Sequence, residues 1–207
     1  MTTFYKKINF LLAFCFCLVL TRVLYTQNLK LSFLLWNLFL AWIPFFASLK
    51  LYKIPSSEKI RFFAILGLTI LFLPNAIYLV TDLIHLKHRI GVPYWYDVIV
   101  LFSFSVLGLI YSTSTLINLE HNLEKIIQKK WVIPSLIGLI FISGYGVYMG
   151  RILRWNSWDV FIHPFHLVIS CSETILQPMT YPAAYGFTVA YGMIQLLFWY
   201  VFRETKI

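Results

Sequence analysis

The segment IRFFAILGLTILFLPNAIYLVTDLI, residues 60–84, decides what kind of protein this chain forms. Its only charged residues are Arg61 and Asp82, which leave twenty uncharged residues between them. An α-helix rises about 1.5 Å per residue, so such a run is long enough to cross the hydrocarbon core of a bilayer, which is about 30 Å thick. We therefore interpret residues 60–84 as a membrane-spanning helix.

The composition of the whole chain points to the same class of protein. Of the 207 residues, 60% are hydrophobic and only 12% are charged, whereas a soluble domain is about half apolar and about a quarter charged. These proportions exclude a soluble enzyme, a disordered tail and a disulfide-stapled module. Five further apolar runs are of spanning length, at residues 8–24, 31–51, 94–116, 131–150 and 183–202. We expect an all-α integral membrane protein with about six transmembrane helices, forming a single polytopic membrane domain over residues 1–207.

The connection between the fifth and sixth spans, residues 151–182, is the longest in the chain but is too short for a domain. Pro164 precedes the apolar sequence LVIS at residues 167–170, and proline suits the first position of a helix. This pattern predicts a short interfacial or re-entrant helix.

The N-terminus has the charge pattern of a signal peptide, because Lys6 and Lys7 precede an apolar stretch. The stretch continues to about Leu24 without a small-x-small cleavage site, so we expect an uncleaved first membrane helix. The three cysteines form no CxxC motif or paired framework, so we expect neither a structural disulfide nor a thiolate zinc site.

The basic residues lie mostly at the ends of the apolar runs, where they orient helices and meet lipid headgroups. We therefore expect the net charge of +9 to favour contact with membrane lipids and not with nucleic acid. Eleven of the seventeen Lys and Arg residues fall on the side that holds both termini, and the other side holds Arg22, Lys30, Lys87, Arg89, Arg151 and Arg154. The positive-inside rule then predicts a multi-pass protein of the cell membrane with both termini in the cytoplasm.

Acidic and imidazole groups gather on the opposite, outer side of this predicted topology. That side holds every aspartate of the chain and four of the five histidines, namely Asp82, Asp97, Asp159, His85, His88, His163 and His166. In the third span, Pro74 removes a backbone donor and Asn75 stands beside the expected kink. Helical spacing places Asn75, Asp82 and His85 on about one face. These residues form a functional site, or they have two separate structural roles. In the second case Asn75 satisfies the carbonyl that the kink leaves free, and Asp82 and His85 face the water of the headgroup region.

Two further segments contribute to this constellation. The motif WYD places Asp97 in the first turn of the fourth span, where the helix dipole favours an anion. Arg151 and Arg154 are three residues apart, so both guanidinium groups can point one way, as partners for Asp97 or as a clamp for a phosphate or carboxylate. The alternative for the two arginines is snorkelling to headgroups, and Asn156 and Asp159 are by default turn or capping residues.

The two His-x-x-His sequences, at residues 85–88 and 163–166, are weak candidates for a metal site. Imidazole and carboxylate are ordinary ligands of zinc or iron, but neither pair has the HExxH form. The metal content and any cofactor stay open at this point. No GxSxG, Walker or Rossmann pattern is present.

The motifs LPNAIYLVTDLIHL, WYD and GRILRWNSWD together resemble the uncharacterised bacterial membrane proteins of domain-of-unknown-function family 1361. The resemblance implies a small polytopic protein over nearly the whole chain and carries no known activity, substrate or cofactor. It implies that one cluster contains Asn75, Asp82, His85, Asp97, Arg151, Arg154, Asn156 and Asp159. Where members often have a second proline in the first motif, this chain has Ile77.

Three classes of function follow from these residues. The first is an outer-surface site that binds or processes an anionic, lipid-linked substrate, with Asp82, His85, Asp97 and Asp159 as catalytic groups and Asn75, Arg151, Arg154 and Asn156 as substrate-binding groups. The second is a small transporter or channel subunit with Asn75, Asp82 and Asp97 on the path, and the third is a structural or accessory protein with a buried ion-pair network. Substrate, oligomeric state and enzymatic activity are not determined by the sequence.

Overall fold

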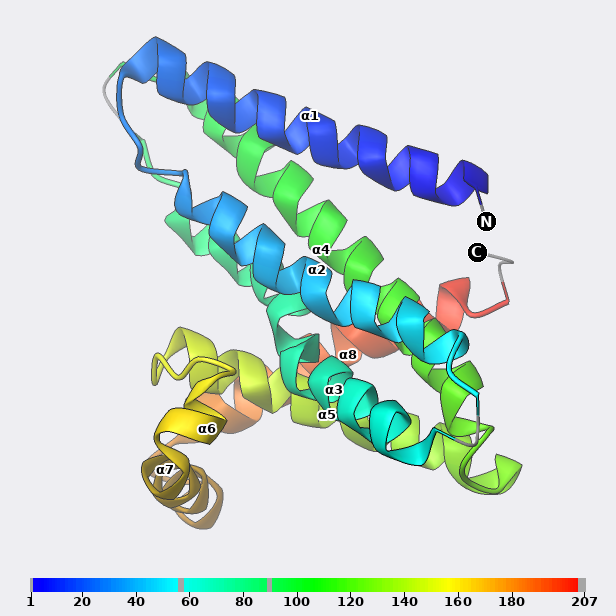
Figure 1. The fold of residues 1–207 in the computed structure, drawn as a ribbon. Helices are drawn as coiled ribbons and strands as arrows, with labels where there is room; N and C mark the ends of the chain where they lie inside the picture. The colour runs from blue at the N-terminus through cyan, green and yellow to red at the C-terminus, as the bar shows by residue number, and fades with distance from the viewer. Residues whose placement is uncertain (1, 56–57, 89–90, 205–207) are drawn as a thin grey trace.

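The computed structural model describes residues 2–55, 58–88 and 91–204, and six long helices run through this part of the chain (Figure 1). They are α1 (Thr2–Thr26), α2 (Phe33–Tyr52), α3 (Lys59–Thr81), α4 (Tyr94–Leu123), α5 (Lys129–Arg151) and α8 (Pro182–Phe202). Each is long and apolar enough to cross a membrane. The prediction of an all-α membrane protein with six spans is therefore confirmed.

The bundle has two distinct ends. The two termini lie near each other at one end, which we call the terminal end (Figure 1). The connections from α1 to α2, from α3 to α4 and from α5 to α8 lie at the other end, which we call the site end. Of the six basic residues expected at the site end, Arg89 lies outside the described residues.

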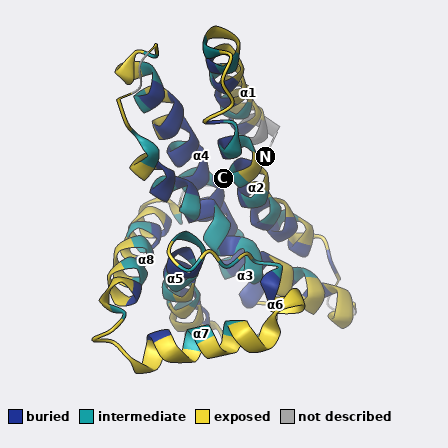
Figure 2. Cartoon of the chain, turned by 90° about the vertical axis from the view of Figure 1, so that its left-hand side faces the viewer, coloured by how far each residue is buried: buried dark blue, intermediate teal, exposed yellow. Residues whose placement is uncertain are grey.

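Three short helices lie at the site end: η1 (Asp82–His85), α6 (Asp159–Ile162) and α7 (Pro164–Leu176). Pro164 occupies the start of α7, as expected. The helix runs crosswise to the spanning helices and exposes most of its length (Figure 2), including Phe165, Val168 and Ile169. One apolar face outward and one face against the bundle are typical of an interfacial helix, so the structure favours this alternative over a re-entrant one.

Small residues allow the helices to approach closely. A Cβ added to Gly144 of α5 would lie 2.6 Å from the carbonyl oxygen of Thr188 in α8, and one added to Gly146 would lie 2.6 Å from Cγ of Pro74 in α3. Small residues at helix interfaces are the usual means of packing in membranes, where the hydrophobic effect does not drive helices together. Helix α5 is thus held between α3 and α8.

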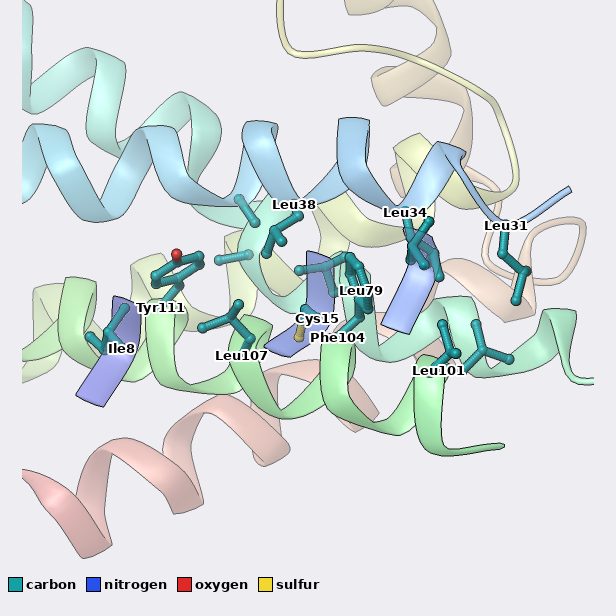
Figure 3. Close-up of a cluster of buried hydrophobic side chains, with 14 of the residues drawn as sticks. Ile8, Cys15, Leu31, Leu34, Leu38, Leu79, Leu101, Phe104, Leu107 and Tyr111 are labelled. Carbon is teal, nitrogen blue, oxygen red and sulfur yellow. The ribbon is translucent and has the colours of Figure 1, made fainter. Parts of the chain in front are cut away.

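Helix α4 is the central element, since it contacts α1, α2, α3, α5 and α8. Helix α1 packs mainly against α4, where Ile8 and Cys15 meet Phe104, Leu107 and Tyr111 (Figure 3). This arrangement separates α1 from α5, and the separation determines which charged groups can meet at the site end.

Candidate functional site

The site end contains a buried ion pair between α3 and α5. Asp82 follows the last residue of α3, and its side chain is completely buried. Arg151 is the last residue of α5, and its side chain is 13% exposed. Nη2 of Arg151 donates to Oδ1 of Asp82. The two helix ends therefore bring together an acid and a base that are separated by 69 positions in sequence.

The other groups around Arg151 hold its guanidinium in one orientation. Nε donates to Oγ1 of Thr81 at 2.8 Å, and Nη1 lies 3.1 Å from Nε2 of His85. The guanidinium also lies over the ring of Tyr78, 4.2 Å from its centroid. A cation at this distance from an aromatic face is attracted to it, so Arg151 is fixed from several sides.

Asn37 connects α2 to the same pair by donating from Nδ2 to Oδ2 of Asp82 at 2.9 Å. Both oxygens of this carboxylate are thereby hydrogen-bonded, which a buried charge requires. We call the six residues Asn37, Tyr78, Thr81, Asp82, His85 and Arg151 the Arg151 cluster. It joins α2, α3 and α5.

Asp97 lies in a different ion pair, so the expectation that Arg151 or Arg154 would be its partner is wrong. Nε of Arg22 lies 2.8 Å from Oδ1 of Asp97, and both side chains are only 2% exposed. The reason is the helix order, because α4 packs against α1 and brings Asp97 to Arg22. Nη1 of Arg22 is buried and has no hydrogen-bond partner among the described residues.

A pocket of about 390 Å³ lies next to the Arg151 cluster, between α2, α3 and α5, and is closed on one side by the segment 155–160 and by α7. We call it the α2–α3–α5 pocket. Further from the site end along α2 and α3, the aliphatic side chains of Leu40, Ile70 and Leu71 line it. Asn37 and Tyr78 belong both to its wall and to the Arg151 cluster. Asn37 contacts Asp82 and Tyr78 contacts Arg151, so these two residues connect the ion pair to the pocket wall.

Neutral polar groups and indole rings also line this pocket, beside further apolar side chains. The polar groups include Asn75, Asn156 and Ser157, and the indoles belong to Trp36, Trp155 and Trp158. Nδ2 of Asn75 donates to Oγ of Ser157 at 2.8 Å and to the carbonyl of Phe72 at 3.1 Å. Asn75 thus supports its own helix beside Pro74 and also joins α3 to the segment after α5.

Asp159 organises the short segment that closes the pocket. Its Oδ2 accepts from the backbone N–H of Asn156 at 2.7 Å and from Nδ2 of the same residue at 3.2 Å. An acidic side chain that reaches back to a backbone N–H three residues earlier has the geometry of a capping box. The capping alternative for Asn156 and Asp159 fits this geometry, while Asn156 also lines the pocket.

Arg151 and Arg154 do not form the expected clamp of two free guanidinium groups, because Arg151 is engaged by the Arg151 cluster. Arg154 is exposed and has φ 61, a left-handed conformation that glycine adopts more readily. The turn that it makes allows the N–H of Trp155 to donate to the carbonyl of Met149 at 3.0 Å. Arg154 therefore reverses the chain at the end of α5 and starts the segment that lines the pocket.

The two His-x-x-His sequences are not brought together. His85 contacts Arg151, whereas His88 stacks on Tyr94 at 4.3 Å between ring centroids. His163 and His166 are exposed, with ring centroids 6.5 Å apart. Within residues 2–55, 58–88 and 91–204, no three His, Cys, Asp or Glu side chains are grouped in a way that could hold a metal ion.

The sequence interpretation missed several residues that build the site, above all Arg22 and Asn37. Both stand within apolar runs, and a polar group inside a membrane helix usually faces the protein interior with a partner. That signal alone would have been enough to select both residues. Tyr78 and Thr81 carry no comparable signal, because tyrosine and threonine are common in such helices.

The comparisons with known proteins agree with the motif resemblance. The model of a family described as a protein of unknown function, DUF1361, matches residues 36–198. The match begins within α2 and therefore leaves out α1. Neither the comparison with curated proteins nor the comparison with solved structures gives a match.

Proposed function

The chain belongs to the DUF1361 family, whose function is unknown, and from its site we propose that it binds the head of an anionic, lipid-linked molecule in the α2–α3–α5 pocket. The observation that carries the proposal is the mixed lining of this pocket. Most of its lining is apolar, including Leu40, Ile70 and Leu71, and three indoles and the polar groups of Asn75, Asn156 and Ser157 also line it. Such a lining suits a ligand that has one apolar and one polar part.

Arg154 supplies the contact to the anion in this proposal. It is exposed, and it precedes Trp155 and Asn156 of the pocket wall. A left-handed backbone conformation costs about 1–2 kcal/mol for a residue with a side chain. Strain of this kind tends to persist where the side chain has a function, which supports a binding role for the arginine at this position.

Arg151 and Asp82 act as positioning residues in the proposed site. The carboxylate of Asp82 is buried and held by Arg151 and Asn37. The pair holds Asn37 and Tyr78 of the pocket wall in position. The ligand itself contacts the residues that line the pocket, and not the pair.

The proposal is tested with dodecyl phosphate as the anionic probe and dodecanol as its neutral match, added to the full chain in phosphatidylcholine nanodiscs. Indole fluorescence reports binding, because three tryptophans line the pocket. We expect dodecyl phosphate to bind about tenfold more tightly than dodecanol, which corresponds to about 1.4 kcal/mol for a charge-assisted contact. Trp158→Phe is expected to reduce the fluorescence response to both probes.

Arg154→Gly separates binding from folding. Glycine adopts the left-handed conformation of residue 154 without strain, so we expect a higher melting temperature. The substitution also removes the guanidinium, so we expect the preference for phosphate to be lost. Arg61→Gln is the control, because it removes an exposed arginine at the terminal end. Equal affinity of wild type and Arg154→Gly for dodecyl phosphate, or equal binding of both probes to wild type, would contradict the proposal.

A structural role is the second candidate, and the two buried ion pairs favour it. One joins α3 to α5 and the other joins α1 to α4. In that case Trp158→Phe and Arg154→Gly would leave the function of the protein in cells unchanged, and only substitutions in the ion pairs would impair it.

We also propose that the termini face the cytoplasm, which would place the α2–α3–α5 pocket at the outer face of the cell membrane. The excess of lysine and arginine at the terminal end supports this orientation. The ligand would then approach from the outer leaflet.

A further inference from the structure

A second and larger cavity lies away from the α2–α3–α5 pocket, between α1, α4 and α8. Its volume is about 800 Å³, and apolar side chains such as Leu11, Phe102 and Phe198 form most of its wall. We call it the α1–α4–α8 groove. Because none of its lining residues belongs to the pocket or to the Arg151 cluster, an inference about it is independent of the proposed function.

Two hydroxyl groups in this groove have no hydrogen-bond partner among the described residues. Thr113 and Ser114 line the groove and are only 5% and 4% exposed. Elsewhere on α4, the hydroxyl groups of Ser105 and Thr115 donate to the carbonyl groups four residues before them, at 2.9 and 2.7 Å. A hydroxyl that faces an apolar groove without an acceptor is unfavourable, so Thr113 and Ser114, which line this groove, point to a ligand that brings acceptors into it.

Lys7 also lines the groove and adds a positive charge to it. The next residue, Ile8, packs beside Tyr111 of α4 (Figure 3), and Tyr111 is within one helical turn of Thr113 and Ser114. The ammonium group and the two hydroxyls therefore belong to one end of the groove, and this is the terminal end of the bundle.

We propose that the α1–α4–α8 groove binds one anionic glycerophospholipid. The acyl chains lie along the apolar wall, the phosphate pairs with Lys7, and the ester carbonyls accept hydrogen bonds from Thr113 and Ser114. In a glycerophospholipid the ester carbonyls stand next to the phosphate, which matches the gathering of the three polar groups at one end. A helix from a second copy of the chain is the competing occupant of the apolar wall, and the variant Val106→Trp distinguishes it from a lipid.

The test uses native mass spectrometry of the full chain purified in detergent and offered equal amounts of dioleoylphosphatidylglycerol and dioleoylphosphatidylcholine. We expect wild type to retain at least fivefold more of the anionic lipid, and Lys7→Ala to lose this preference. Lys6→Ala is the matched control, since it removes the same charge one residue earlier but Lys6 does not line the groove. Equal loss in the two variants would show general surface attraction and would overturn the proposal, as would equal retention of both lipids by wild type.

Two further variants test the groove itself. Thr113→Val keeps the shape of the side chain and removes the hydroxyl, so it is expected to weaken retention of both lipids about threefold. Val106→Trp places an indole in the groove and is expected to abolish retention while the monomer keeps its helical circular dichroism. If Val106→Trp instead leaves lipid retention intact and dissociates a dimer, the groove is an interface between copies and the proposal is wrong.

Discussion

At the scale of single residues, the charged groups of this protein are stabilised by specific partners that come from other helices. Asp82 has a guanidinium on one oxygen and an amide on the other, and Asp97 has Arg22. A charge that loses its partner inside a membrane protein has no water to replace it. We therefore expect the free energy of unfolding to fall strongly when one charged member of the Arg151 cluster is replaced. It should fall much less when both members of the ion pair are replaced together.

Asp82→Ala leaves the guanidinium of Arg151 beside an apolar side chain. We expect the free energy of unfolding in detergent to fall by about 3–5 kcal/mol, because the remaining charge stays buried. The double variant Asp82→Leu with Arg151→Met removes both charges and is expected to regain most of this loss. Unfolding followed by circular dichroism during SDS titration measures the two effects.

The surface pair of Glu58 and Arg61 provides the control for this experiment. Its side chains are 44% and 65% exposed, and an exposed pair contributes about 0–1 kcal/mol. Glu58→Ala should therefore change the unfolding midpoint very little. A double variant at Asp82 and Arg151 that is no more stable than Asp82→Ala would show that the charge pair is not the source of the stability.

At the scale of helices, α5 carries much of the geometry of the site. One of its faces approaches Pro74 and Tyr78 of α3 through Gly146 and Gly150, and Gly144 approaches α8. Gly146 and Gly150 also line the α2–α3–α5 pocket. The GxxxG spacing of these two glycines thus determines both helix packing and the shape of the pocket.

Gly146→Leu is expected to force α5 away from α3, because even a Cβ there would lie 2.6 Å from Pro74. Overpacking of this kind usually lowers stability by about 1–3 kcal/mol, and the added side chain would enter the pocket. We therefore expect a lower melting temperature in detergent and weaker binding of dodecyl phosphate.

Gly138→Leu is the matched control on the same helix, since nothing lies within 4 Å of a Cβ added at Gly138. This glycine is exposed, and a leucine facing lipid should be tolerated. Leucine forms helices better than glycine, so equal destabilisation by both substitutions would mean that the contact with Pro74 is not the cause of the effect at Gly146.

At the scale of the whole molecule, the two ends of the bundle differ in chemistry. The site end holds the Arg151 cluster, the pair of Arg22 and Asp97, and the crosswise helix α7 (Figure 2). The terminal end holds the pair of Glu120 and Arg203, with 2.7 Å between Oε1 and Nη2, and the lysine-lined end of the α1–α4–α8 groove. The two proposed binding sites therefore face opposite membrane surfaces.

The orientation itself is open to a direct test. A green fluorescent protein fused after Ile207 should fluoresce, and alkaline phosphatase fused after Met179, which is 94% exposed between α7 and α8, should be active. Both outcomes follow from the positive-inside rule, which predicts that the terminal end stays in the cytoplasm. The reverse pair of results would place the α2–α3–α5 pocket at the cytoplasmic surface.

Local composition is sufficient to place the six spans and the helix that begins at Pro164, because hydrophobic length and proline geometry act within one segment. The groups of Asp82, His85 and Arg151 do converge, as the constellation predicts, and Asn75 and Asn156 do line one pocket.

The pairing of aspartates with arginines is not determined within one segment, because the two partners come from different helices. Asp97 pairs with Arg22 and Asp82 with Arg151 because α1 lies against α4 and α5 against α3. Lipid surrounds every apolar helix equally well, so hydrophobic runs do not specify neighbours. That choice comes from close packing at small residues and from buried polar contacts between distant segments, which exist only once the bundle has assembled.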